Sequence, residues 1–388
     1  MTTSLAEQLR RLQTPQSSMF FDSVKRDSIL FSAKDAATKS RETIYDIGIS
    51  GLEELIAINP IFKEFESTLF ERTARDLQRA VETKEVNALL TKNIKKFFFH
   101  LSPYFMLAST HKCLEWLIRR FGINNFNKDE LMMLILPYHQ TNMFVRCIQI
   151  MKIQDPNDKW YFLADVKKSS SPLSKAAVFN HGAQNPQFLE FIGKYTTEAI
   201  KELDSKAGSL QTMMSFYCTT VIGALEYSKS ITDSHILSIV RYVFKGFKSS
   251  VIDYTAAAYM ITAQLLVKVK LTPKLLNEMI EKMTVTIHES LSVNIILLLT
   301  LIFETQNDDI VLSDQSLENI LAAKWIPSAL GQIKREGTPI VAFYRGLIAS
   351  SLTKIQEQDE SSAEFKDLCE SLMTEVVLEN EEASLIIR

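Results

Sequence analysis

The amino-acid sequence predicts an all-α fold, and more specifically an α-solenoid of HEAT-like helical hairpins. Three observations lead to this prediction. Apolar residues recur three or four positions apart along most of the chain, which is the spacing of one helix face. The pattern then repeats about every 40 residues, the interval typical of HEAT hairpins. Finally, the 388 residues include only 11 glycines and 10 prolines, so the frequent turns of strand-rich folds are not expected.

Helical spacing appears first in a succession of segments before residue 153. They cover residues 45–56, 61–70, 86–101, 114–121, 131–136 and 143–151. The helix at 114–121 is the clearest, because Leu114, Leu117 and Phe121 share one face and Gly122 follows as a helix terminator. A fully buried Leu or Phe contributes roughly 1.5–3 kcal/mol of transfer free energy, so these faces stabilise the chain only where neighbouring helices cover them. We therefore expect the helices to stack.

The repeat is clearest after residue 235. An apolar face from Ile236 to Phe247 is followed by a second helix, for which Asp253 is the expected N-cap. The next hairpin begins with Thr272 as cap and Pro273 at the first helical position. Corresponding positions of the two hairpins lie roughly 40 residues apart, whereas a tetratricopeptide repeat is shorter. Single hairpins cannot bury both faces without stacking, so an α-solenoid is predicted.

A loop or linker is predicted at residues 154–174, where Pro156, Pro172 and a serine cluster interrupt the pattern. The linker separates an N-terminal helical solenoid segment, residues 1–153, from HEAT-like repeats at 175–388.

The two ends of the chain carry further expectations. The opening MTTSLAEQLRRLQ is amphipathic and lacks the apolar stretch of a signal peptide. A second break in the helical pattern is expected at 306–313. Leu385 to Ile387 are apolar, and no repeat with a polar outer face follows them, so we expect the chain to be truncated at its C-terminus.

Composition and charge indicate a folded intracellular protein. Apolar residues make up 46% and charged residues 23%, and the net charge is −3, so no global attraction to nucleic acid is expected. The apolar run Ile295–Phe303 is far shorter than the roughly 20 residues of a membrane span, so we interpret it as a buried helix. Widely separated cysteines without a CxxC pair suggest reduced core residues, at Cys113, Cys147, Cys218 and Cys369.

Motifs for catalysis or cofactor binding are missing from the sequence. It contains no GxxxxGK[ST], GxGxxG, GxSxG or HExxH, and its six histidines do not form a metal-binding pattern. Gly48 and Gly51 alone cannot cradle a phosphate, so helix packing explains them better. We therefore expect no enzymatic activity, no catalytic residue, no cofactor and no metal site.

A candidate docking surface is formed by basic residues on two predicted helices. On one helix three lysines share a face, and on the other two arginines follow a tryptophan, so each group combines positive charge with a nearby aromatic ring. The alternative is a solvated face, or cations that complement the dipole at a helix C-terminus. The candidate residues are Trp116, Arg119, Arg120, Lys92, Lys95 and Lys96.

Several strings of the sequence resemble a known family. They are GLEEL at 51–55, HLSPYF from His100, KCLEWLIRRFGI, LPYHQTNMFVR ending at Arg146, and KGFKSSVIDYTAAAYMITAQLLVKV at 245–269. These strings are similar to the N-terminal region of the HEAT repeat-containing protein 1 family. Members of that family are large HEAT-repeat subunits of the small-subunit processome, are associated with small nucleolar RNA, and are several times longer than this chain.

The resemblance implies a non-enzymatic scaffold in the nucleus and nucleolus. It would act in pre-rRNA processing toward 18S rRNA and in support of RNA polymerase I transcription. The implied partners are other processome subunits of the transcription-coupled subcomplex, both β-propeller and helical proteins. Contact with pre-rRNA or small nucleolar ribonucleoprotein would be mostly indirect, and neither a membrane nor a small-molecule substrate is implied.

Two other functions stay open from the sequence. A transport or adaptor solenoid of karyopherin kind would also be all-α and mildly acidic, but it would bind cargo or a Ran-type GTPase. A direct RNA-binding solenoid would lose affinity steeply as salt is added, because counterions are released on binding.

Overall fold

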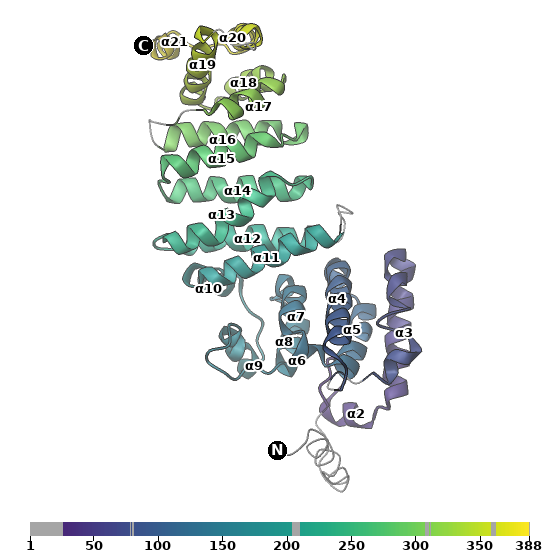
Figure 1. Cartoon of the computed structure of the whole chain (residues 1–388). Coiled ribbons are helices and arrows are strands. Elements are labelled where there is room, and N and C mark those ends of the chain that lie inside the picture. The colour runs from purple at the N-terminus through teal and green to yellow at the C-terminus, as the bar shows by residue number, and fades with distance from the viewer. Residues whose placement is uncertain are drawn as a thin grey trace, which may run out of the picture. The chain divides into compact units, whose positions relative to one another are not determined.

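The computed structural model describes residues 26–77, 79, 81–203, 210–306, 310, 312–357 and 362–387, and within these residues the regular elements are helices (Figure 1). The all-α solenoid prediction is confirmed. The chain divides into two compact units, Met1–Pro172 (unit 1) and Leu173–Arg388 (unit 2). Among the described helices, none is at once long enough and apolar enough to cross a bilayer.

Unit 1 is built from short helices and 3₁₀ turns. Its α-helices are α2 (Ala33–Thr38), α3 (Arg41–Ile58), α4 (Lys84–Leu101), α5 (Ala108–Phe121), α6 (Ile123–Phe126), α7 (Lys128–Ile135), α8 (Asn142–Ile150) and α9 (Ala164–Ser169). Gly122 ends α5 in the left-handed conformation, with φ of 59°, as its sequence position predicts.

Helices α3 and α5 form the closest pairing in unit 1, and two glycines make this pairing possible. A Cβ atom on Gly48 would lie 2.6 Å from Cβ of Trp116, and a Cβ atom on Gly51 would lie 2.6 Å from the carbonyl oxygen of Ser109. Such distances are shorter than van der Waals contact, so only glycine fits at both positions. The spacing of Gly48 and Gly51 therefore serves helix packing.

The helix predicted at 61–70 is wrong in detail. Pro60–Phe65 is a 3₁₀ helix (η2), started by Asn59, whose side chain accepts from the Ile61 N–H at 3.1 Å, and turns follow it. Its aromatic side chains still pack as a core. The ring centroids of Phe62 and Phe65 lie 5.9 and 4.8 Å from that of Phe97 on α4. A 3₁₀ helix followed by turns buries these rings as effectively as an α-helix would. The spacing of apolar residues therefore does not distinguish the two backbone structures.

The segment 154–174 contains more structure than the predicted loop. Tyr161–Leu163 forms a 3₁₀ helix (η6), and α9 follows it directly. Trp160 is buried and its indole N–H donates to Asp129 at 2.8 Å, which fastens the segment to α7 of unit 1.

Unit 2 is a stack of helical hairpins in two rows. Its helices are α10 (Lys175–Gln184), α11 (Pro186–Leu203), α12 (Gln211–Tyr227), α13 (Asp233–Phe247), α14 (Ile252–Lys268), α15 (Pro273–Val285), α16 (Ser292–Thr305), α17 (Asp314–Ala322), α18 (Ile326–Arg335), α19 (Val341–Gln356), α20 (Ser362–Glu375) and α21 (Asn380–Ile387). Helices α11, α13, α15 and α17 pack in one row, and α10, α12, α14, α16 and α18 pack in the other.

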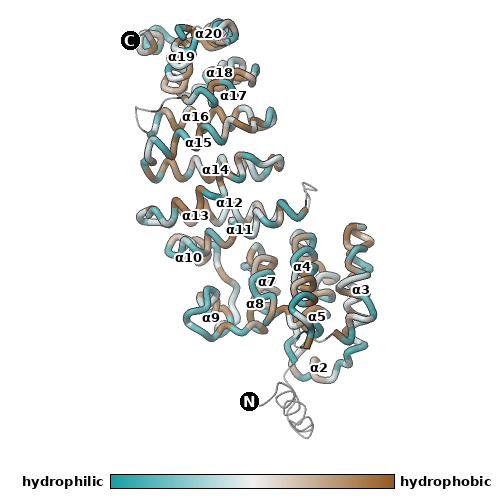
Figure 2. The backbone as a smooth tube through the Cα atoms, in the orientation of Figure 1, coloured by the Kyte–Doolittle hydropathy of each residue, from teal (hydrophilic) through white to brown (hydrophobic). Residues whose placement is uncertain are grey.

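The two rows differ in how apolar their helices are. Helices α11 and α13 carry a clear apolar face and a polar one, whereas α14 and α16 are apolar over most of their circumference. Figure 2 shows apolar residues along the helices of both units. Met260 on α14 and Leu297 on α16 remain exposed, because the neighbouring helices cover only part of each surface.

One cap prediction in unit 2 is confirmed and another is wrong. Thr272 caps α15 by accepting from the Leu275 N–H at 3.4 Å, and Pro273 occupies the first helical position. Helix α14 instead begins at Ile252 after Val251, so Asp253 lies within its first turn. In this position the carboxylate interacts favourably with the positive end of the helix dipole, but it does not cap the helix.

Some expectations fall outside the described residues. These are the opening SLAEQLRRL string and, within the second break, residues 307–309 and 311. The side chains of Leu385 and Ile387 also lie outside the described part.

Candidate functional site

The residues predicted to form a docking surface on α5 are held mainly by contacts inside unit 1. Trp116 is only 1% exposed, and its indole N–H donates to the Leu69 carbonyl at 3.0 Å. Its ring meets that of Tyr45 edge to face, with centroids 5.1 Å apart. Trp116 therefore packs as a core residue between α3 and α5, whereas the sequence analysis placed it on the docking surface. A partner cannot use it as an exposed anchor.

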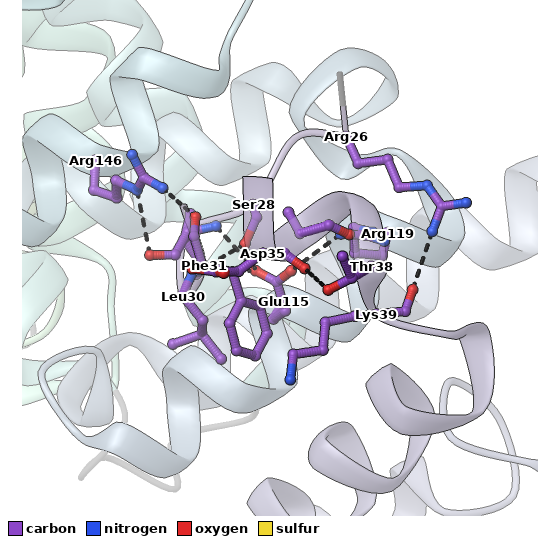
Figure 3. Close-up of polar contacts among 12 residues, drawn as sticks. Arg26, Ser28, Leu30, Phe31, Asp35, Thr38, Lys39, Glu115, Arg119 and Arg146 are labelled. Atoms are coloured by element: carbon purple, nitrogen blue, oxygen red, sulfur yellow. Dashed lines mark hydrogen bonds and ion pairs between the residues drawn. The ribbon is translucent and has the colours of Figure 1, made fainter. Parts of the chain in front are cut away.

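Glu115, the residue before Trp116, is a fully buried carboxylate that holds an early part of the chain. Its Oε2 atom accepts from the Ser28 hydroxyl at 3.0 Å and from the backbone N–H groups of Ile29 and Leu30 at 2.9 and 3.3 Å. Buried charges are tolerated only when such partners replace water. Residues 26–38, here called the strap segment, are thus fastened to α5 (Figure 3).

Two arginines complete this attachment. Arg119 donates to the Ala36 carbonyl at 3.1 Å and lies 3.9 Å from Glu115. Arg146 donates to the carbonyl oxygens of Phe31 and Ile29 at 2.5 and 3.4 Å (Figure 3). Glu115 and Arg119 of the KCLEWLIRRFGI string and Arg146 of the LPYHQTNMFVR string therefore hold the strap segment.

Arg120 is the member of the predicted set with unused hydrogen-bonding capacity. Its Nε donates to the Ala74 carbonyl at 2.7 Å, but its Nη2 is buried and has no hydrogen-bond partner among the described residues. Burial lowers the pKa of Arg120, and the nearby cation of Arg41 lowers it further, while Asp76 opposes this effect. An anion bound beside the Arg120 guanidinium would therefore supply a hydrogen-bond acceptor. It would also reduce the repulsion between Arg41 and Arg120.

These residues surround a pocket of about 450 Å³ in unit 1. Four arginines line it, and Asp27 is the single acidic residue of the lining. Asp27 already accepts from the Asn124 side chain at 2.8 Å. The lining residues are Arg26, Asp27, Ser40, Arg41, Ile44, Trp116, Ile118, Arg119, Arg120, Gly122, Asn124 and Asn125. Arginine guanidinium groups bind carboxylate and phosphate in a bidentate manner, so the pocket suits an anionic group.

The three predicted lysines do not join this pocket. They lie on α4, and none of them lines the cavity. Lys92 is exposed, the Lys95 ammonium lies 5.7 Å from the centroid of the Phe99 ring, and Lys96 forms an ion pair with Glu64 at 2.7 Å. The predicted lysines and arginines therefore belong to two separate groups of cations in unit 1.

The structure adds Arg26 and Arg41 to the site, and sequence reasoning missed both. Arg26 donates to the Lys39 carbonyl at 3.0 Å, and Arg41 lies 3.6 Å from Asp76. Arg26 is the first residue of the strap segment and Arg41 lies just after its end, so both are far in sequence from α5. No local pattern marks them, because their position depends on the pairing of α3 with α5.

Thiol and metal chemistry find little support. All four cysteines are free, and burial raises the pKa of Cys147 to about 12 and that of Cys218 to about 11. A thiol with a raised pKa is a poor nucleophile near neutral pH. In the part of the chain that the structure describes, no three His, Cys, Asp or Glu side chains converge as a metal site would require.

Comparison with known proteins gives consistent relatives. The family model for U3 small nucleolar RNA-associated protein 10 matches residues 235–351, which lie in unit 2. The HEAT repeat-containing protein 1 homolog of Drosophila melanogaster is 39% identical over 389 aligned positions, covering 100% of this chain and 19% of the relative. HEAT repeat-containing protein 1 of Homo sapiens is 42% identical over 291 positions, covering 74% of this chain and 14% of the relative.

A fungal relative has the same name as the matching family model. U3 small nucleolar RNA-associated protein 10 of Candida albicans is 32% identical over 204 positions, covering 51% of this chain and 11% of the relative. The chain spans about a fifth or less of the length of these relatives.

Proposed function

Because the chain is homologous over its whole length to the HEAT repeat-containing protein 1 family, we propose that it is a non-enzymatic scaffold for ribosome biogenesis in the nucleolus. The relatives support this assignment, since some are named for HEAT repeats and others for association with U3 small nucleolar RNA. The observation that carries the proposal is the hairpin stack of unit 2, which contains the matched residues 235–351. Such stacks offer extended surfaces on which other subunits dock.

We further propose the assembly in which the scaffold acts. It acts within the small-subunit processome, in the transcription-coupled subcomplex, where it promotes processing toward 18S rRNA and supports RNA polymerase I transcription. Its partners are β-propeller and helical subunits of that subcomplex. The names of the relatives support an association with small nucleolar ribonucleoprotein, and the subcomplex assignment extends this association.

The arginine-lined pocket is the docking surface of unit 1 in this proposal, and an acidic segment of a partner subunit is its occupant. Arg41 is exposed, and Arg120 lines the pocket with a guanidinium whose buried Nη2 has no hydrogen-bond partner among the described residues. A carboxylate placed between them would gain charge-assisted hydrogen bonds and relieve their mutual repulsion. Arg119 acts indirectly, since its donors hold the strap segment that forms one wall. Lys92, Lys95 and Lys96 form a separate basic face on α4.

Co-purification from cells tests both levels of the proposal. The tagged full chain is expected to recover U3 small nucleolar RNA, detected by hybridisation, and to localise to the nucleolus. The double variant Arg41→Gln with Arg120→Gln is expected to lose at least one protein partner. The matched control, Arg72→Gln with Arg345→Gln, removes the same charge at exposed positions and is expected to keep every partner.

The outcomes test the pocket assignment and the processome function separately. Retention of all partners by the Arg41 and Arg120 variant overturns the pocket assignment alone. Failure of the unmodified chain to recover U3 RNA, together with recovery of a Ran-type GTPase, overturns the processome function in favour of a transport solenoid.

A further inference from the structure

A second charged cavity, of about 480 Å³, lies in unit 2 and belongs to none of the sites described above. It opens between α11, α13 and α15, which are successive helices of one row, beside the start of α14. Four of its ten lining residues are lysines, and none is acidic. The lining residues are Thr197, Ile200, Lys201, Phe244, Lys245, Lys248, Ser249, Ser250, Tyr254 and Lys282. We call this cavity the lysine pocket.

Aromatic rings hold two of the ammonium groups at the pocket. The Lys245 ammonium lies 4.7 Å from the centroid of the Tyr242 ring, and the Lys282 ammonium lies 4.3 Å from that of Phe244. Lysine stems cover apolar surface in this way while their charged ends stay in water. The remaining cations, Lys201 and Lys248, are exposed. The pocket therefore presents positive charge from three successive helices to one solvent-filled space.

Neighbouring acidic groups only partly balance this charge. Near the pocket, Glu190 pairs with Arg241 and Glu278 pairs with Lys282. The pKa of Lys245 is lowered by burial first and then by the cations of Lys201 and Arg241, while Glu198 opposes them. The lining itself contains four lysines and no carboxylate, so the pocket favours binding of an anion.

We propose that the lysine pocket binds the phosphodiester backbone of single-stranded nucleic acid without sequence preference. A lysine ammonium is a compact, freely rotating charge, which suits a diffuse chain of phosphates, whereas phosphopeptide sites rely on the rigid fork of arginine. The rings of Tyr242 and Tyr254 are buried, so the pocket offers charge to the phosphates and no stacking platform to the bases, which agrees with binding without sequence preference. A duplex fits less well, because its stiff paired backbones cannot bend into a concave pocket of about 480 Å³, whereas a flexible single strand can.

This inference goes beyond the scaffold proposal, in which contact with RNA is mostly indirect. It rests on unit 2 alone and does not depend on the arginine-lined pocket of unit 1.

Salt-dependent binding of the full chain to a labelled oligouridine of about 12 nucleotides tests the inference. Fluorescence anisotropy is measured at 50 and 200 mM salt, a range over which phosphate contacts weaken strongly. The test variant is Lys201→Gln, Lys245→Gln and Lys248→Gln. The control variant is Lys229→Gln, Lys274→Gln and Lys366→Gln, which removes the same charge from exposed positions of unit 2.

The expected result is specific to the pocket. Plotted as log affinity against log salt, binding has a negative slope, and each phosphate contact on a single strand contributes about 0.7 to its magnitude. Loss of three contacts therefore reduces that magnitude by about 2. We expect the test variant to bind at least about tenfold more weakly than wild type at 50 mM salt, and the control to stay within about twofold.

Three outcomes overturn the proposal: no salt-dependent binding by wild type, equal losses in both variants, or an oligoglutamate of equal charge that binds as tightly and is lost equally. The last outcome assigns the pocket to an acidic protein partner. If the triple variant fails to fold, the single charge reversal Lys248→Glu at an exposed position replaces it, with Lys274→Glu as its control.

Discussion

The carboxylate of Glu115 lies 3.0 Å from the hydroxyl of Ser28, although 87 positions separate the two residues in the chain. The same carboxylate oxygen also accepts from two backbone N–H groups of the strap segment. Together with Arg119 and Arg146, this side chain holds residues 26–38 in place, and Arg26 and Asp27 of this segment line the arginine-lined pocket. The docking surface of unit 1 is therefore coupled to a buried polar contact.

Replacing Glu115 with Gln is expected to destabilise the protein by roughly 1–3 kcal/mol, because a neutral amide accepts more weakly from the three donors and turns its N–H₂ group toward the Arg119 cation. Urea unfolding followed by tryptophan fluorescence measures the loss. Hydrogen exchange at the Ile29 and Leu30 amides is expected to accelerate, since a neutral amide oxygen is a weaker acceptor than the carboxylate. The exposed control Glu53→Gln is expected to change neither quantity, and equal behaviour of the two variants would show that the contact does not hold the strap segment.

Replacing Gly48 with Ala is expected to cost about 1–3 kcal/mol of unfolding free energy. The new methyl group would lie 2.6 Å from Cβ of Trp116, and that side chain is buried on all sides, so α3 and α5 must move apart. Thermal unfolding gives the measurement. Asp46→Ala, on the exposed face of the same helix, serves as control and is expected to stay within about 0.5 kcal/mol of wild type. A Gly48→Ala protein as stable as this control would contradict the close packing of the two helices.

Lowering the pH is expected to destabilise the protein through His181. Burial lowers the pKa of His181 in the folded state to about 4, whereas an unfolded histidine titrates near its ordinary value of about 6.5. The unfolded chain therefore takes up a proton first, and stability that is present above pH 6.5 is lost as the pH falls toward 4. Urea midpoints at pH 7 and pH 5 should fall less in His181→Gln than in wild type. An identical pH dependence in both proteins would remove His181 as the cause.

Cysteine alkylation is expected to be slow in the folded protein. The pKa of Cys218 is raised to about 11 and that of Cys147 to about 12, so little thiolate exists at pH 8. Mass spectrometry after iodoacetamide treatment should find Cys218 modified before Cys113 and Cys147, because Cys218 is half-buried and the other two are fully buried. In denaturant the three should react at similar rates. Rapid labelling of Cys113 in the folded chain would contradict its burial.

The same raised pKa values predict a loss of stability at alkaline pH. Below about pH 8 the Cys147 thiol is protonated in both states and does not affect stability. Above its unfolded pKa of about 8.5 the unfolded chain releases the proton while the folded chain retains it up to about 12. Unfolding is therefore favoured as the pH rises through this window, and Cys147→Ala should show a weaker decline than wild type in urea midpoints at pH 8 and pH 10.

Much of the helical architecture was predictable because helix formation leaves a local signature. The segment at 114–121 lies in α5, all but the last residue of the segment at 131–136 lies in α7, and the expected cap at Thr272 begins α15. The signature fails where burial is achieved by other means. Phe62 and Phe65 show helical spacing but lie in a 3₁₀ helix, because packing against Phe97 fixes the rings and not the backbone between them.

The candidate site was only partly predictable, because exposure is a property of the assembled helices. The aromatic and basic composition of residues 115–120 identified the right helix but not the role of each side chain. Trp116 fills the space left by Gly48, and Arg119 is committed to the Ala36 carbonyl. Lysines four residues apart on α4 looked equivalent to these arginines, yet they line no part of the pocket.

The spacing of apolar residues and the scarcity of glycine and proline determined the helical class and the hairpin repeat, since both depend on interactions between residues a few positions apart. Only the tertiary structure decided which cations share a pocket. Arg41 meets Arg120, and Ser28 meets Glu115, through contacts that bridge about 80 residues or more. Contacts of that range arise from the packing of whole helices, and no local periodicity encodes them.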